Sequence, residues 1–223
     1  MRLASLTLAL LALTPLAASA QDAPDKRPTW FIFLEKGGKT SEDKDLVEKM
    51  QRGHIANFQR LFGEKKLFAA GPMSDPSGKK RGIVVVRAET RAELLGYFEP
   101  DDYVREGYMT INAERAAAHR ALHTEGIDPN GIEEERIVQI SRPAKPLSKR
   151  EDQEHDAFLK TLLDKGTVGA WYTLEAGPIA EVLFCRTTDT KALEEAFAAL
   201  PVVKESKATV QIWPQYLSKG VVR

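Results

Sequence analysis

An internal duplication is the feature that most constrains the fold of this 223-residue chain. The stretch "HIANFQRLFGEKKLFAAG" begins at His54, and it aligns with "HDAFLKTLLDKGTVGAWY", which begins at His155, at an offset of about 100 residues. Further along, "VVVRAETRAELLGYF" aligns with "LFCRTTDTKALEEAF", so that Phe98 falls on Phe197. The landmarks keep their order and spacing in both stretches. The chain therefore contains two copies of one unit.

Each copy is predicted to form a strand, a helix, two strands, a helix and a final strand. Aromatic and β-branched runs indicate the strands, and Ser or Thr followed three residues later by an acid indicates where helices begin. In the first copy the strands are expected at 29–35, 67–71, 82–88 and 108–116, with helices starting after Thr40 and Thr90. In the second copy they are expected at 136–142, 167–173, 179–187 and 208–214, with helices starting after Ser148 and at Thr190.

This order of elements is that of the ferredoxin-like fold, whose four-stranded sheet carries both helices on one face. The other face is left uncovered, and two such sheets within one chain can cover each other. We predict an α+β fold in which two ferredoxin-like (βαββαβ) repeats pack sheet to sheet and close into a barrel. Repeat 1 is expected at 28–118 and repeat 2 at 135–217, with a polar, turn-rich linker at 119–134 between them.

Residues 1–20 have the features of a secretory signal peptide. Arg2 precedes an apolar stretch, and "ASA" before Gln21 is a small-residue cleavage site. No later stretch is apolar for long enough to cross a bilayer. We therefore expect an exported mature protein, periplasmic or secreted, with no membrane segment once the leader is removed.

Composition narrows the partners that such a protein can have. Lys and Arg together number 32, as do Asp and Glu, so the formal net charge is zero. Nucleic-acid-binding domains are usually clearly basic, and no nucleic-acid partner is expected. Cys185 is the only cysteine, which excludes an internal disulfide. Because the duplication supplies a partner sheet within the chain, we expect a monomer with an internal pseudo-dimer.

One titratable residue lies on a helix face that should be buried. His54 shares its side of the first predicted helix with Met50, Phe58 and Leu61. The same position recurs as His155 in the second copy. Either these are core histidines bonded to the backbone, or at least one of them is a functional group.

The first copy, from Trp30 to Arg115, resembles the YCII-like family of the dimeric α/β-barrel superfamily. The pieces that carry the resemblance are "RGHIANFQRL", "LFAAGPM", a "VVV" strand and "DDYVREGYM", in that order. The resemblance implies an active-site His–Asp pair beside a cavity between sheet and helices. By position these residues are His54 and Asp101. The family has a proline where this chain has Asp102, so which of the two carboxylates faces the imidazole stays open.

The resemblance implies small-molecule chemistry of the lyase or isomerase kind, such as dehydrochlorination, although related barrels isomerise lactones, oxidise quinols or bind haem. Fold alone therefore identifies no reaction. An imidazole held by a carboxylate is suited to general acid–base catalysis. No metal, nucleotide or redox motif is present, and no cofactor is expected. The alternative is an exported module that binds a ligand or a partner without catalysis, and the sequence leaves both readings open.

The second copy departs from the first at the candidate acids. The alignment places Leu200 and Pro201 at the positions of Asp101 and Asp102. We therefore expect His155 to lack that acid and repeat 2 to have a structural role. His119 and His123 are four residues apart, a spacing compatible with metal binding on a helix, but no third ligand accompanies them, and an exposed linker helix is expected.

Overall fold

The computed structural model describes residues 25–223, apart from the side chains of Pro129 and Asn130, so the expected leader at 1–20 lies outside the described residues. Repeat 1 contains β1 (Thr29–Lys36), α1 (Lys44–Gly63), β2 (Leu67–Pro72), β3 (Lys80–Arg87), α2 (Arg91–Gly96), α3 (Asp102–Arg105) and β4 (Met109–Arg120). Repeat 2 contains β5 (Asp128–Ser141), α4 (Lys149–Asp164), β6 (Ala170–Leu174), β7 (Ile179–Cys185), α5 (Thr190–Ala198), α6 (Pro201–Lys204) and β8 (Val210–Lys219).

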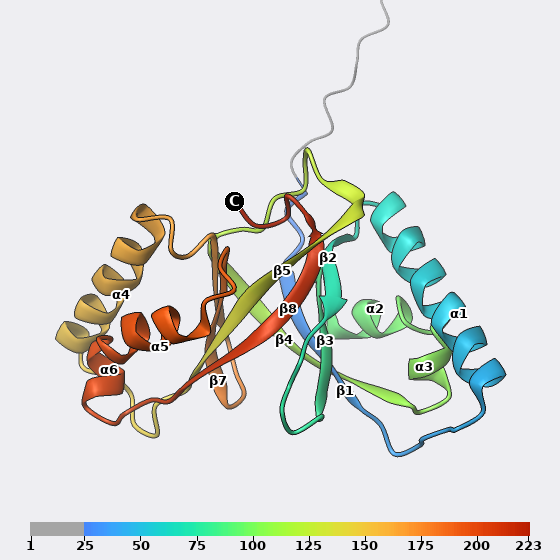
Figure 1. Cartoon of the computed structure of the whole chain (residues 1–223), viewed down its shortest axis with the longest axis horizontal. Coiled ribbons are helices and arrows are strands. Elements are labelled where there is room, and N and C mark those ends of the chain that lie inside the picture. The colour runs from blue at the N-terminus through green and yellow to red at the C-terminus, as the bar shows by residue number, and fades with distance from the viewer. Residues whose placement is uncertain (1–24) are drawn as a thin grey trace, which may run out of the picture.

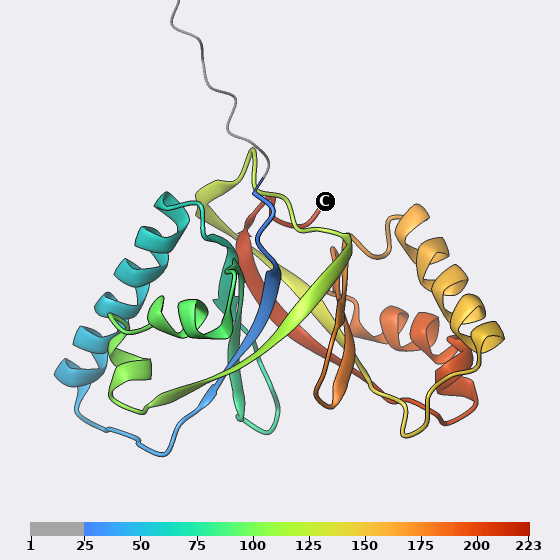
Figure 2. The same cartoon turned by 180° about the vertical axis from the view of Figure 1, so that it is seen from behind.

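The strands form one eight-stranded sheet in the order β2-β3-β1-β4-β6-β7-β5-β8. Antiparallel pairing of β4 with β6 joins the two repeats. The outer strands also meet, because Met73 bridges Gln215 and Ser74 N donates to Pro214 O at 2.9 Å. The sheet is thus nearly closed into a barrel, with α1–α3 on one flank and α4–α6 on the other (Figures 1 and 2). The predicted fold class is confirmed.

Close approach of β2 to β8 explains one glycine in the "LFAAGPM" strand. A Cβ atom at Gly71 would lie 1.9 Å from the carbonyl oxygen of Tyr216. Only glycine fits where two backbones come this near to each other. The amide of Gln215 then ties the same edge by donating to the carbonyl oxygens of Gly71 at 3.1 Å and Pro72 at 2.9 Å.

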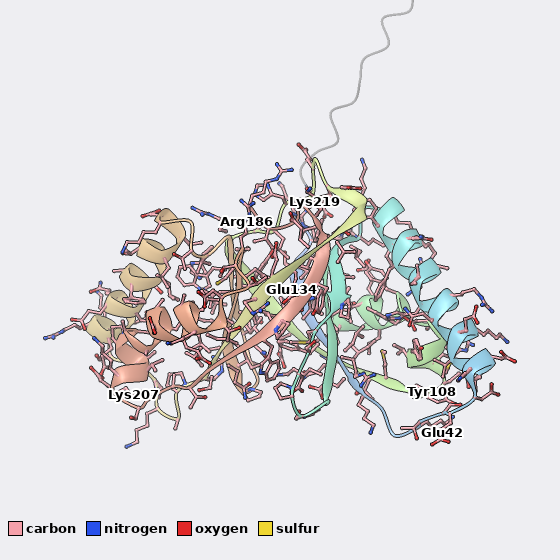
Figure 3. The ribbon with its side chains drawn as sticks, viewed as in Figure 1. Glu42, Tyr108, Glu134, Arg186, Lys207 and Lys219 are labelled. Atoms are coloured by element: carbon pink, nitrogen blue, oxygen red, sulfur yellow. The ribbon has the colours of Figure 1, made fainter. Side chains whose placement is uncertain are left out.

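Apolar side chains fill three cores. The barrel interior is packed by residues of both repeats, including Phe31, Phe33, Tyr172, Phe184 and Leu217. A second core lies between the repeat 1 helices and the sheet, and a third lies between the repeat 2 helices and the sheet. Side chains occupy the space between helices and sheet on both flanks (Figure 3). Each helix layer therefore has its own core on the outer face of the barrel.

Local capping explains where the helices begin. Ser148 and Glu151 form the expected capping box of α4, and Thr90 accepts from Glu93 N at the start of α2. The start of α1 differs from expectation, because the cap is Asp43 and not Thr40. The Asp43 carboxylate accepts from two backbone amides of the first turn, which satisfies the donors that a helix start leaves free.

Part of the segment 119–134, which we expected to be a linker, is strand. β4 continues to Arg120, whose partner in β6 is Trp171, and β5 already begins at Asp128. Pairing of β4 with β6 of the other repeat, and of β5 with β8 of its own repeat, supplies the backbone partners that a solvated linker would lack. His119 is therefore in a strand and shares no helix face with His123, contrary to expectation. No helix within residues 25–223 is long and apolar enough to cross a membrane.

Candidate functional site

His54 and Asp101 form a buried pair under α1. The Nδ1 atom of His54 lies 2.6 Å from Oδ2 of Asp101. Asp101 is fully buried, whereas 11% of the His54 side chain remains exposed. The second carboxylate oxygen of Asp101 accepts from the backbone amides of Tyr103 at 3.1 Å and Val104 at 3.4 Å. One carboxylate thus caps α3 with one oxygen and holds the imidazole with the other.

The Asp102 carboxylate has another partner than the imidazole. Its carboxylate pairs with Arg105 on the next turn of α3, at the surface. On its other side it approaches α1 closely, since a Cβ at Gly53 would lie 2.6 Å from Asp102 Oδ2. Of the two carboxylates that the sequence offered, the one that faces His54 is therefore Asp101.

Aromatic rings fix the orientation of the His54 imidazole. The ring centroid of Phe58 lies 4.3 Å away, and that of Tyr103 lies 5.5 Å away in an edge-on arrangement. His54 lines none of the four cavities described for residues 25–223. Phe58 does line one of them, a mostly apolar space of about 250 Å³ between α1 and the edge of the barrel. Phe58 thus contacts both this space and the His54 ring.

Repeat 2 contains a second buried pair, which the sequence reasoning missed. His155 Nε2 lies 2.6 Å from Oε2 of Glu181. Oε1 of Glu181 accepts a hydrogen bond of 3.1 Å from the indole nitrogen of Trp171. His155 lacks the acid of His54, as expected, because Leu200 stands at the position of Asp101; strand β7 supplies a different acid, Glu181, which was not expected.

Glu181 could have been found from one property of its strand. It is the only charged residue in the otherwise apolar stretch 179–185. It alternates with Val182, which faces the barrel interior, and so shares the helix-facing side with Leu183. A carboxylate on that side is buried and needs a partner under the helix.

The environment of His155 favours its charged form. Burial lowers the pKa of this imidazole, but the hydrogen bond to Glu181 and the negative charges of Glu181, Asp156 and Asp152 outweigh burial. The net effect is a pKa above the ordinary value of 6.5. In its protonated form, which this shift favours, the imidazole makes a buried ion pair with the Glu181 carboxylate.

The other residues considered from the sequence, His119 and Cys185, lie in surroundings that indicate a structural role. His119 stacks on Trp171 with ring centroids 3.6 Å apart, and its Nε2 lies 2.8 Å from the Thr173 hydroxyl. No group of three or more His, Cys, Asp or Glu side chains in the described part of the chain is arranged to hold a metal ion. Cys185 is buried, and burial raises the pKa of its thiol to about 12, so it is not a thiolate nucleophile at neutral pH.

No protein-family model and no curated protein matches this sequence. Solved structures do match its fold. A mutant chlorite dismutase from Candidatus Nitrospira defluvii has a TM-score of 0.54 and 12% identity, covering 86% of this chain and 92% of that one. A proposed monooxygenase from Fusobacterium nucleatum has a TM-score of 0.53 and 10% identity, covering 88% of this chain and 96% of that one. At such low identity the likeness shows the dimeric α/β-barrel fold alone.

Proposed function

We propose that this protein is an exported, YCII-like barrel protein that performs acid–base chemistry on a small molecule with His54 and Asp101. The observation that carries the proposal is the 2.6 Å contact between His54 Nδ1 and the buried Asp101 carboxylate. A carboxylate on one ring nitrogen fixes the tautomer and stabilises the protonated ring, which leaves Nε2 for a substrate. The reaction class is abstraction of a proton, with elimination or isomerisation of the substrate.

Hydrogen bonds fix the position of the Asp101 carboxylate relative to α1. Its carboxylate caps α3, and the Tyr103 hydroxyl of α3 donates to the Val47 carbonyl oxygen of α1 at 3.3 Å. Helix α3 is in this way tied to the helix that carries His54. Such a connection keeps acid and imidazole in one geometry, which general acid–base catalysis requires.

The test compares three variants on a panel of small chlorinated rings and unsaturated lactones. Chloride release and exchange of substrate C–H for deuterium are measured. His54→Ala should lose about 10²–10⁴-fold in rate, the usual contribution of a general acid or base. Asp101→Asn should also lose rate, whereas Asp102→Asn, the matched control on the neighbouring surface carboxylate, should retain it. Equal rates in all three variants would contradict the assignment of the acid and base.

A second candidate function is a ligand-binding module without catalysis. The observation that favours it is that His54 lines none of the described cavities, while the barrel interior is filled by side chains. The same panel separates the two functions. A catalytic site exchanges substrate protons in a His54-dependent manner, whereas a binding module takes up ligand without exchange.

Export is a separate part of the proposal, and it rests on the sequence of residues 1–20. The mature protein purified from its native host should begin at Gln21. Mass spectrometry of the intact protein checks this. A chain that begins at Met1 in the cytoplasmic fraction would contradict export.

A further inference from the structure

The largest of the four cavities described lies in repeat 2, on the flank opposite to His54. Its volume is about 670 Å³, compared with about 400, 250 and 170 Å³ for the others. This size lies within the range of small-molecule sites, about 300–1,000 Å³. The cavity lies between α4, the segment 140–147 and the outer face of strands β4, β6 and β7. Its apolar lining includes Ile140, Pro143, Pro146, Leu147, Val202 and Ala208.

His155 and Glu181 both line this cavity, and one atom of the pair lacks a partner. His155 is only 6% exposed, and its Nδ1 atom is buried without a hydrogen bond to any described residue. A buried polar group that stays unpaired costs about 1–3 kcal/mol, so such groups usually have a reason to be there. The ring cannot turn to satisfy Nδ1 without giving up Glu181, which Trp171 holds from the other side.

The charges around the ring favour a hydrogen on Nδ1. Glu181 faces Nε2 from β7, and Asp152 and Asp156 lie on α4 itself, so the protonated ring is favoured. In that form both ring nitrogens carry hydrogen, and the free one needs an acceptor. His119 from β4 also lines the cavity.

Two cations stand at the exposed edge of the same cavity. Arg142 is held in place because its Nε donates to Gly177 O at 2.9 Å and its Nη2 donates to Leu174 O at 2.7 Å. Lys145, three residues later in the same segment, is exposed and also lines the cavity. Asp152 and Asp156 of α4 line the same cavity, so side chains of both charges border it.

We propose that this cavity binds a small molecule with an apolar body and an acceptor oxygen, a carboxylate or a carbonyl, that takes the hydrogen bond of His155 Nδ1–H. The apolar lining holds the body of the ligand. The imidazole, positioned by Glu181 and Trp171, holds its oxygen. The site lies in the other repeat from His54, and it needs neither His54 nor the function proposed for it.

Binding is tested by ligand-observed NMR with aromatic acids, each matched to its primary amide and its methyl counterpart; 2-naphthoate, 2-naphthamide and 2-methylnaphthalene form one such set. The acid and the amide should bind at millimolar concentration or below, and the methyl compound should bind at least about tenfold more weakly, since each lost charge-assisted hydrogen bond is worth about 1.5–3 kcal/mol. His155→Phe, which keeps a ring but removes both nitrogens, should abolish that difference. His54→Phe is the matched control and should leave it unchanged.

A second variant keeps the test valid should His155→Phe fail to fold. Glu181→Gln still offers an oxygen to Trp171, but it removes the negative charge that favours the imidazolium. It should weaken the acid more than the amide, because only the acid depends on a charged donor. This comparison also tells whether a carboxylate or a carbonyl is the better ligand.

Three results would overturn the proposal. One is that no acid or amide in the panel binds, and another is that the methyl compounds bind as well as the acids. The third is a haemin absorbance shift that depends on His155, which would assign the imidazole to iron and not to an oxygen acceptor. If no His54-dependent catalysis is found, these three outcomes are unaffected. The failure of one proposal can therefore be told apart from the failure of the other.

Discussion

The two repeats place a histidine at the same position of the same helix, yet they hold it with acids from different elements. In repeat 1 the acid is Asp101, directly before α3, and it contacts Nδ1 of His54. In repeat 2 the acid is Glu181, in the middle of β7, and it contacts Nε2 of His155. The free nitrogen is therefore Nε2 in one half and Nδ1 in the other. Both repeats therefore pair a buried imidazole with a carboxylate, but the carboxylate comes from a different element in each.

Neither repeat can use the acid position of the other. The residue that aligns with Glu181 in repeat 1 is Gly82, where a Cβ would lie 2.7 Å from the carbonyl oxygen of Gly71. The residue that aligns with Asp101 in repeat 2 is Leu200, which is fully buried in the apolar core. Leu200 precedes α6 without a side-chain cap, and Pro201 takes the first helical position, where a missing N–H costs nothing. In repeat 1 the close approach of two backbones at Gly82 excludes an acid there. In repeat 2 the apolar packing around Leu200 excludes one at that position.

The largest loss of stability is expected when repeat 2 is given an acid at the position that Asp101 has in repeat 1. Leu200→Asp would bury a carboxylate in an apolar core, while His155 is already paired with Glu181. An uncompensated buried charge costs about 3–5 kcal/mol, and the free energy of unfolding should fall by that amount. Urea denaturation measures it.

The control for this substitution is Leu95→Asp in repeat 1, since Leu95 is 42% exposed. Its cost should stay within about 0.5 kcal/mol. A similarly small loss for Leu200→Asp would mean that repeat 2 tolerates an acid before α6, and that the difference between the halves is not enforced by packing.

A somewhat smaller loss of stability is expected in both repeats when an equivalent buried leucine is shortened. Leu61 in α1 and Leu162 in α4 are equivalent, with 0% and 7% of their surface exposed. Each change to Ala should lower the free energy of unfolding by about 2–5 kcal/mol, the usual result of removing a buried Leu side chain. Ile55→Ala, at a position that is 46% exposed, serves as the control on α1. A near-zero change at Leu61 or Leu162 would mean that the two helices do not present equivalent faces to the sheet.

The smallest expected effect is a pH-dependent loss of stability when Glu181 of repeat 2 is neutralised. Because the pKa of His155 is raised in the folded state, the pair with Glu181 stabilises the protein fully below the unfolded pKa. That stabilisation is lost as the pH rises through the folded pKa. Glu181→Gln should therefore cost more stability at about pH 5.5 than at about pH 8.5. NMR titration of the His155 ring should show a lower pKa in the variant.

Glu175→Gln, an exposed carboxylate of the same repeat, is the control for this measurement. It should leave the pH dependence of stability unchanged. A cost of Glu181→Gln that does not vary with pH would show that Glu181 acts as a neutral hydrogen-bond partner and not as the charge that favours the imidazolium.

Much of the fold follows from local features of the sequence. Three features depend on residues a few positions apart, and each was predictable: the order of helices and strands along each repeat, the capping box at Ser148 and the inward position of both histidines. The barrel was predictable as well, because a duplicated one-sided sheet needs a second sheet to cover it. The exact extent of β4 and β5 was not, since the end of β4 pairs with β6 of the other repeat and the start of β5 pairs with β8, about 90 residues further along the chain.

The sequence by itself determined that two equivalent helices each turn one histidine toward the sheet, because helical periodicity is a local property. Only the tertiary structure decided which acid meets each of them. Asp101 is 47 residues from His54, and Glu181 is 26 residues from His155. Contacts over such distances depend on strand register, on the cap of α3 and, in repeat 1, on the close approach of β2 to β3 at Gly82, which leaves no room for a side chain. These are properties of packing between elements, and no pattern within one element encodes them.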